Sequence, residues 1–134
     1  MPFSTAGFGQ SAARFARHAV VLAQPVLADS PLTNTADAAG AVVVAQRGVC
    51  SFVEKARRVQ AAGGVAVVFV NTDEELFTIG GESGDDDITI PIVGVRASDG
   101  RALLLHGGSD VHATFDCAHL ALLDIQSCSY SLLP

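Results

Sequence analysis

The stretch AVVVAQRGVCSFVEKARRVQAAGGVAVVFVN, residues 41–71, carries the strongest indications of the fold class. Its two ends, Ala41–Gln46 and Val65–Asn71, are apolar and rich in β-branched residues, which is typical of strands buried on both faces. Between them, Ser51 and Glu54 have the spacing of a capping box, in which the two side chains satisfy backbone N–H groups at the start of a helix. The stretch therefore predicts a strand, a loop, a helix and a second strand.

The predicted helix begins at about Phe52 and ends at Gly63-Gly64, because glycine readily adopts the left-handed backbone that follows a helix. One helical face carries the small and apolar residues Phe52, Ala56, Val59 and Gly63. The charged residues lie largely off that face: Glu54, Lys55, Arg57 and Arg58. A crossover through such a helix usually makes its two strands parallel. The loop from Arg47 to Cys50 then lies at the carboxyl end of the first strand, where ligands tend to sit in α/β sheets.

The size and charge of the whole chain limit its class. We expect 134 residues to form a single domain over 1–134, and 49% apolar with 16% charged residues to form a compact core. A net charge of −6 with 8 basic residues argues against nucleic acid as a partner. No apolar run reaches the ~18 residues of a transmembrane helix, so no transmembrane segment is expected. The N-terminus also lacks the pattern of a signal peptide.

Half of the 14 acidic residues lie between Asp73 and Asp87. Such a run is most often a solvated loop, and the alternatives are a calcium site or a dock for a basic partner. Calcium takes roughly six to eight oxygens at alternating positions, and Gly84–Asp87 lacks that spacing. We therefore predict no metal ion and no cofactor.

The rest of the chain predicts further elements of an α/β domain. Three more strands are expected: Ala19–Ala28, Ile88–Val95 and Asp110–Phe115. A second short helix is expected over Asp99–His106, with Ser98 as its N-cap. Asp29–Gly40 has the composition of a loop. His119–Pro134 either adds a strand or trails off, and its leucines, if exposed, would favour a dimer or a neighbouring domain.

The three cysteines, Cys50, Cys117 and Cys128, cannot all pair within one chain. Cys117 and Cys128 can form one bridge that leaves Cys50 alone, and a reduced protein with three free thiols is the alternative. Spacing does not decide between the two.

Cys50 is also a candidate nucleophile, because a helix N-terminus and a neighbour such as Arg47 stabilise a thiolate. A thiol hydrolase needs a histidine within hydrogen-bond reach. The available histidines are far along the chain and in no local signature: His106, His112 and His119. The simpler interpretation of Cys50 is a small, half-buried apolar side chain.

RGVCSFVEKARRVQAAGGVAVVFVN, residues 47–71, resembles the signature of the protease-associated (PA) domain. In that signature an Arg-Gly-x-Cys-x-Phe loop leads into a Lys- and Ala-bearing helix and then an apolar strand that ends in Asn. Other matching pieces follow in order: AGFG (6–9), QPVLADSPL (24–32), IPIVGVRASDGRALL (90–104) and HATF (112–115). The resemblance covers about residues 5–116 and leaves 117–134 as a C-terminal extension.

The resemblance implies a β-rich α/β fold, a small closed or partly open β-barrel of about six to seven strands flanked by two short helices. PA domains occur as inserts in subtilisin-like proteases and metallopeptidases, and in the lumenal parts of vacuolar sorting receptors and RING ubiquitin ligases. Some are small secreted glycoproteins. The family is taken to bind peptides or proteins, or to gate a neighbouring protease site, without catalysis of its own. It implies an endomembrane, vacuolar or extracellular location.

In the sorting receptors the Arg-Gly-x-Cys-x-Phe loop helps to hold cargo peptide, which implies Arg47, Gly48, Cys50 and Phe52 as a peptide-binding site here. Arg47 offers planar donors, and Gly48 lets a ligand backbone approach. The structural alternative is that Phe52 is core and Gly48 serves a turn. Many members have a cysteine after the first strand, seemingly able to pair with the cysteine of the loop; this chain has Asp29-Ser30 there, so Cys50 is expected to lack that partner.

Three functions follow as hypotheses. The first is a non-catalytic domain that binds a peptide or protein partner. The second is a regulatory or gating insert of a peptidase whose catalytic domain lies elsewhere. The third is a small cysteine-dependent hydrolase, which would require a fast-reacting Cys50 thiol.

Overall fold

The computed structural model describes residues 4–5, 14–81, 84–106, 108–117 and 128–133. Its elements follow in chain order: β1 Ser4–Thr5, β2 Arg14–Leu22, α1 Thr35–Ala38, β3 Val42–Gln46, α2 Phe52–Ala61, β4 Ala66–Val70, β5 Ile92–Val95, α3 Ala97–His106, β6 Gly108–Cys117 and β7 Cys128–Leu133. Within the described ranges, no helix is both long and apolar enough to cross a membrane.

One mixed sheet organises the molecule, with the strand order β1-β5-β4-β3-β2-β6-β7. The four neighbours β5, β4, β3 and β2 are parallel. The outer pairings, β1 with β5, β2 with β6 and β6 with β7, are antiparallel. The register of β3 and β4 runs from Val42 opposite Ala66 to Gln46 opposite Val70, so the predicted parallel crossover is confirmed.

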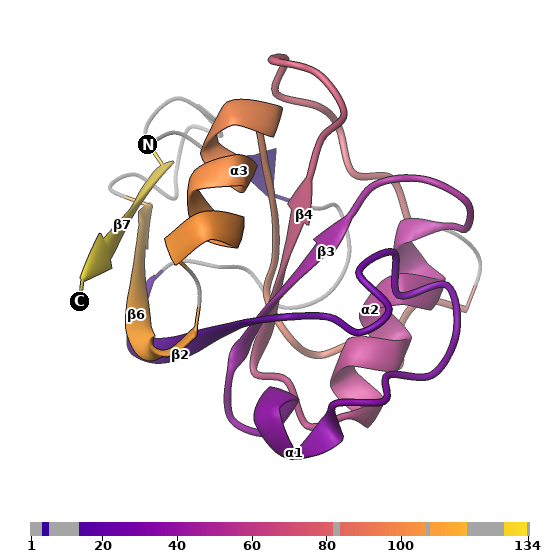
Figure 1. Ribbon diagram of the computed structural model, residues 1–134. Coiled ribbons are helices and arrows are strands. Elements are labelled where there is room, and N and C mark those ends of the chain that lie inside the picture. Colours follow the sequence, from indigo (N-terminus) through magenta and orange to yellow (C-terminus); the bar gives the residue numbers. More distant parts are fainter. Residues whose placement is uncertain (1–3, 6–13, 82–83, 107, 118–127, 134) are drawn as a thin grey trace.

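Helices α2 and α3 cover opposite faces of this sheet (Figure 1). On one face Val53 and Val59 of α2 pack in a core that includes Phe69. On the other face Leu103 of α3 packs in a second core that includes Val68. Because side chains alternate along a strand and both faces are covered, β3 and β4 are apolar at nearly every position, as the sequence predicted.

The start of α2 is the predicted capping box. The backbone N–H of Glu54 donates to Ser51 Oγ over 3.2 Å, and Glu54 Oε2 accepts from the Ser51 backbone N–H over 3.4 Å. These bonds satisfy N–H groups that a first helical turn leaves unpaired. The predicted helix after β3 is therefore confirmed. The second predicted helix, after β5, is α3, and the α/β class is confirmed with it.

The prediction of a closed barrel is wrong. The sheet is open over the described residues, with β1 and β7 at its two ends. A barrel needs every strand to have two neighbours, and β1, which pairs with β5, is only 2 residues long. Four parallel strands with helices on both faces instead form an open layered sheet.

Several predicted boundaries also shift. The strand expected from Ile88 begins only at Ile92, because Pro91 has no N–H to donate to a ladder. The strand expected over residues 19–28 ends at Leu22, and the loop expected over residues 29–40 contains the short helix α1. Ser98 lies inside α3, which begins at Ala97. Residues 110–115 lie within β6, and the C-terminal segment does add a strand, β7.

Gly100 lets α3 lie unusually close to β4. A Cβ atom at this position would lie 2.0 Å from Cγ1 of Val70, well inside van der Waals contact. The helix therefore packs its backbone directly on the strand whose carboxyl end leads into the candidate site.

Candidate functional site

The site lies where parallel strands end. The carboxyl ends of β2, β3 and β4 share one edge of the sheet because these strands are parallel neighbours. The backbone N–H of Arg47, just after β3, donates to Val70 O over 3.0 Å, and that of Gln46 donates to Val26 O over 2.8 Å. The start of the loop predicted to carry ligand-binding residues is therefore held between the segment that follows β2 and the last residue of β4.

Arg47 is the exposed cation of this edge. Its Nη1 donates to Oδ1 of Asn71 over 3.0 Å. Its guanidinium carbon lies 5.1 Å from the ring centroid of Phe77 and 5.9 Å from that of Phe52, within the range of cation–π attraction. The guanidinium is thus fixed by a hydrogen bond and two aromatic rings.

Asn71 organises the loop that follows β4. It is only 2% exposed. Its Nδ2 donates to Asp73 Oδ1 over 2.9 Å and to the carbonyl of Glu75 over 2.8 Å, while its Oδ1 also accepts from the Thr72 backbone N–H over 2.8 Å. A buried amide with every polar atom bonded is a positioning group. In the sequence, Asn71 was recognised only as the last residue of the motif, and no role was predicted for it.

Phe52 connects the loop to the core. Its ring lies 4.9 Å from that of the buried Phe69 and 5.6 Å from that of Phe77, and it is half-buried. The packing on Phe69 supports the structural role that the sequence left open, and the contact with Arg47 places the same ring at the site edge. Phe77 was missed, although it is the one aromatic residue of the acidic segment.

Gly48 and Val49 form the tip of the loop. Gly48 has φ +120° and Val49 has φ +74°, and Val49 is 79% exposed. Glycine adopts the left-handed region at little cost, whereas a β-branched residue there is strained. An exposed apolar side chain on a strained backbone is a recurrent feature of functional loops. Val49 occupies the variable position of the motif and was therefore not selected from the sequence.

Cys50 is a half-buried, free thiol. Its Sγ lies 3.4 Å from Nη1 of Arg58 and 4.0 Å from the carbonyl oxygen of Ala28, next to the position where a partner cysteine was expected and Asp29 stands. Of the histidines considered as a base, His119 lies outside the described residues. The described contacts of the thiol are therefore with the Ala28 carbonyl and with two cations from α2, Arg58 and Lys55.

The prediction that Lys55 lies off the buried face of α2 is wrong. Its side chain is fully buried, and its Nζ donates to the carbonyl of Leu27. Burial lowers the pKa of Lys55, while the neighbouring Cys50 and Asp29 act in the opposite direction. Lys55 precedes Val59 by four residues, so helical spacing indicated the buried face and its charge concealed it.

The acidic segment is partly structural. Glu74 Oε2 accepts from the Ser98 hydroxyl and, over 3.4 Å, from the Ser98 backbone N–H at the start of α3. Asp87 forms a two-point ion pair with Arg57 at 2.7 and 2.9 Å, and these hydrogen bonds lower the pKa of Asp87. Over the ranges that the structure covers, no group of three His, Cys, Asp or Glu residues is placed to hold a metal ion.

Cys117 and Cys128 are directly opposite each other as Cα partners of the antiparallel strands β6 and β7. Antiparallel partners have Cα atoms about 4.5–5.5 Å apart, a separation that a disulfide can bridge. A bridge between them stays a prediction.

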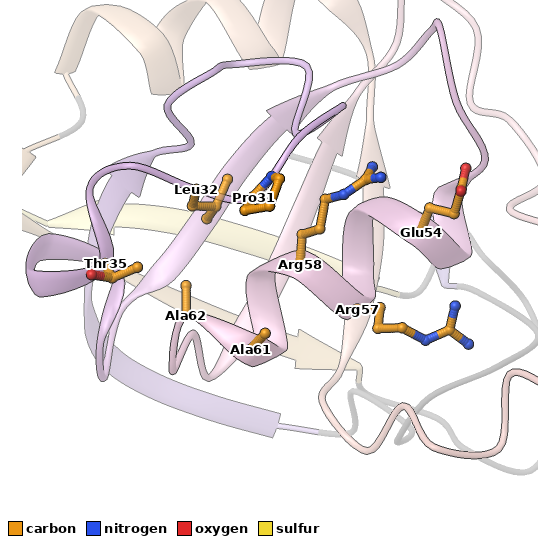
Figure 2. Close-up of a pocket in the computed structure, with 8 residues that line it drawn as sticks. All are labelled: Pro31, Leu32, Thr35, Glu54, Arg57, Arg58, Ala61 and Ala62. Atoms are coloured by element: carbon orange, nitrogen blue, oxygen red, sulfur yellow. The ribbon is translucent and has the colours of Figure 1, made fainter.

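A groove lies on the outer side of α2. Its lining does not include Arg47 or the residues that hold the Arg47 guanidinium. Its volume is about 390 Å³, and it opens between α2 and the segment that precedes α1. Figure 2 shows its lining residues: Pro31, Leu32, Thr35, Glu54, Arg57, Arg58, Ala61 and Ala62.

The model of the PA domain family matches residues 6–103, and the chain belongs to this family. The sequence is 38% identical over 69 residues to aminopeptidase YwaD of Bacillus subtilis (strain 168), covering 52% of this chain and 15% of that protein. It is 33% identical over 93 residues to the ER degradation-enhancing alpha-mannosidase-like protein 3 of Xenopus laevis, covering 63% of this chain and 10% of that protein. The chain thus spans a small part of these relatives.

The fold is also similar to a solved structure, the aminopeptidase from Aneurinibacillus sp. strain AM-1. The TM-score is 0.59 with 17% sequence identity, over 91% of this chain and 33% of that one. The part of that protein matched by this chain therefore has a similar fold.

Proposed function

We propose that this chain is a non-catalytic recognition domain that binds a peptide or protein through the loop Arg47–Phe52 and the facing residues Asn71 and Phe77. The observation that supports this most directly is the fixed guanidinium of Arg47 at the carboxyl edge of the sheet, held by Asn71 over 3.0 Å and stacked near Phe77. A charged group that is exposed and yet held in one place is suited to recognition, because little side-chain entropy is lost when a ligand binds.

The chemistry of the edge matches an extended peptide. A guanidinium has five N–H donors, and Arg47 uses one of its nitrogens on Asn71. Its other donors suit a peptide carbonyl or carboxylate, which accept from the planar fork. Val49, 79% exposed, offers an apolar contact two residues away. Gly48, with no side chain, leaves room for the ligand backbone to approach.

Cys50 has a supporting role in this proposal. Its Sγ contacts Arg58 and the Ala28 carbonyl rather than the exposed edge, so it joins the loop to its neighbours. We assign it no nucleophilic function, and the domain carries out no reaction of its own. Slow alkylation of Cys50 is the expected result.

A second candidate, a gating or regulatory insert of a peptidase, is favoured by the comparisons. The similar proteins include two aminopeptidases, and the matched region covers only 15% of the length of one of them. In this case the partner of the Arg47 edge is a peptidase domain or its substrate. The relative whose name refers to ER degradation supports an endomembrane location.

Capture from a degenerate peptide pool tests the proposal. Wild type, Arg47→Ala and Arg101→Ala are immobilised side by side. Arg101 is an exposed arginine on α3 whose 3.4 Å ion pair with Glu74 of the β4 loop is solvent-exposed and contributes little, so its removal is expected to leave the Arg47 loop in place. We expect wild type and Arg101→Ala to enrich one peptide class and Arg47→Ala to lose it. Equal enrichment by all three would remove Arg47 from the site, and enrichment by none would favour the insert that acts only beside a peptidase domain.

A further inference from the structure

The groove on the outer side of α2 is a second site that the Arg47 edge does not use. Its volume of about 390 Å³ lies within the range of pockets that take small ligands or single peptide residues. One wall is α2, and the other is the segment from Pro31 to Thr35 (Figure 2). The floor includes two side chains that are almost fully buried, Leu32 at 7% and Ala62 at 8% exposure, so the groove has an apolar base.

Arg58 supplies the polar group that points to a ligand. It is half-buried and lines the groove. Its two hydrogen bonds, to the Ala28 carbonyl over 2.9 Å and to Cys50 Sγ over 3.4 Å, both leave from Nη1. Within the described part of the chain, its Nε and Nη2 make no hydrogen bond. A guanidinium that is anchored at one nitrogen and has unused donors at the others is suited to a carboxylate.

The other charged residues of the groove limit what it accepts. Arg57 is engaged with Asp87 at 2.7 and 2.9 Å, so its charge is largely balanced. Glu54 stands one turn before Arg58 on α2 and contributes a negative charge. One carboxylate at Arg58 is therefore favourable, whereas a second anion next to it meets Glu54. An amide N–H, which can donate to Glu54, suits that position better.

We infer that this groove binds the carboxyl terminus of a peptide whose last residue is small and apolar. The terminal carboxylate lies at the guanidinium of Arg58, the last side chain rests on the apolar floor beside Ala61, and the preceding amide faces Glu54. This site does not include the Arg47 guanidinium, and Arg58 links the two regions through its contact with Cys50 of the Arg47–Phe52 loop. A peptide side chain carboxylate or a free small acid offers Arg58 the same group without the adjoining apolar residue and amide.

Amide chemical shifts of the ¹⁵N-labelled chain test this site with defined probes. The probe is N-acetyl-Gly-Ala-Val with a free carboxylate, and its matched control is the same peptide as the carboxamide. Two further controls are N-acetyl-Asp-amide and isobutyrate, which represent a side-chain carboxylate and a free acid. We expect the free-acid peptide to shift the amides of residues 31–35 and 57–62 in a saturable way, and to bind at least tenfold more tightly than each control.

Two substitutions assign the effect to the groove. Ala61→Met fills the groove with a good helix former and leaves the bonds of Arg58 intact, so we expect binding to be lost. Arg58→Lys keeps the charge without the planar fork, and we expect binding at least fivefold weaker. Arg101→Ala, on the opposite face, is expected to bind as wild type does. Spectra outside the groove report whether each variant keeps its fold.

Three results would overturn the inference: equal affinity for the acid and the carboxamide, unchanged binding by Ala61→Met, or no saturable shift at any residue. Shifts confined to residues 47–52 would also overturn it, and they would instead support the Arg47 edge. Failure of the groove leaves the proposed function standing, because peptide capture with Arg47→Ala tests the Arg47 edge separately.

Discussion

The Nη1 of Arg47 donates to Oδ1 of Asn71 over 3.0 Å, and this bond joins the loop after β3 to the loop after β4. Asn71 is itself held by Asp73, Glu75 and Thr72 through its other hydrogen bonds. The orientation of an exposed guanidinium therefore depends on a buried amide. The candidate site is a product of two adjacent parallel strands rather than of one motif.

Asn71→Ala is expected to weaken both the fold and the site. It removes the hydrogen bonds through which a buried amide orders the β4 loop, which costs about 1–3 kcal/mol in the free energy of unfolding. Urea unfolding measures this loss. Arg47 remains in the variant and is no longer fixed, so we expect weaker peptide capture under conditions where the variant is folded. A folded Asn71→Ala that captures peptide as well as wild type would show that the bond does not position Arg47.

Val49→Asn separates stability from binding. The left-handed backbone at Val49 is costly for a β-branched residue and well tolerated by asparagine, so we expect the variant to be about 1 kcal/mol more stable in urea unfolding. We also expect weaker peptide capture, because the exposed apolar contact is gone. A less stable variant would mean that Val49 makes a packing contribution larger than its strain.

Gly100→Ala tests the close contact of α3 with β4. The new methyl group would overlap Val70, and overpacking of this kind costs about 1–3 kcal/mol, which exceeds the gain of about 1 kcal/mol in helix propensity. The matched control is Gly80→Ala, where a Cβ meets no atom within 4 Å. Thermal or urea unfolding compares the two. Equal stabilities would contradict the packing described for α3.

Lys55→Met tests the buried lysine through pH. Burial lowers the pKa of Lys55, so between its folded and unfolded pKa values the unfolded chain binds a proton that the folded chain does not. The free energy of unfolding therefore rises with pH below the ordinary lysine pKa of about 10.4, with a slope of at most about 1.4 kcal/mol per pH unit. Lys55→Met is expected to lose this rise.

The Lys55 experiment is made on proteins that also carry Cys50→Ala, because the side chain of Cys50 interacts electrostatically with Lys55. Urea unfolding at several pH values gives the slope for each protein. Identical slopes with and without Lys55 would mean that its pKa is the same in the folded and unfolded chains.

Much of the fold was predictable where the signals are local. Ser51 and Glu54 specify the start of α2 through bonds within one turn, and the apolar strands on either side of it specify a parallel crossover. Pro91 likewise limits β5 by its own chemistry. Such features depend on residues that are close together in the sequence, so local sequence patterns are enough to predict them.

The errors concern contacts between distant residues. Lys55 is buried because the carbonyl of Leu27, 28 positions away, receives its Nζ, and no local pattern encodes that partner. The start of α3 is met by Glu74 from a loop 24 positions before Ser98, so Ser98 need not be the cap. The expected barrel was closed or partly open, and the closed form is wrong because the sheet is open over the described residues. Closure depends on whether the outermost strands pair with each other, which their own sequences do not determine.

The candidate site was predictable only in part. The motif selected Arg47, Gly48, Cys50 and Phe52, and the structure places Arg47 and Phe52 together while Cys50 faces Arg58. Asn71 and Phe77 join the site through the parallel pairing of β3 and β4. Val49 was missed because the feature that distinguishes it is backbone conformation, which a variable motif position does not reveal.

Peptide recognition at the Arg47 edge is tested by mapping a captured peptide onto the ¹⁵N-labelled chain. Saturable amide shifts at Arg47–Phe52 and at Asn71–Phe77, lost in Arg47→Ala and kept in Arg101→Ala, are the expected result. Shifts elsewhere on the chain, or identical shifts in wild type and Arg47→Ala, would contradict recognition at the carboxyl edge of the sheet.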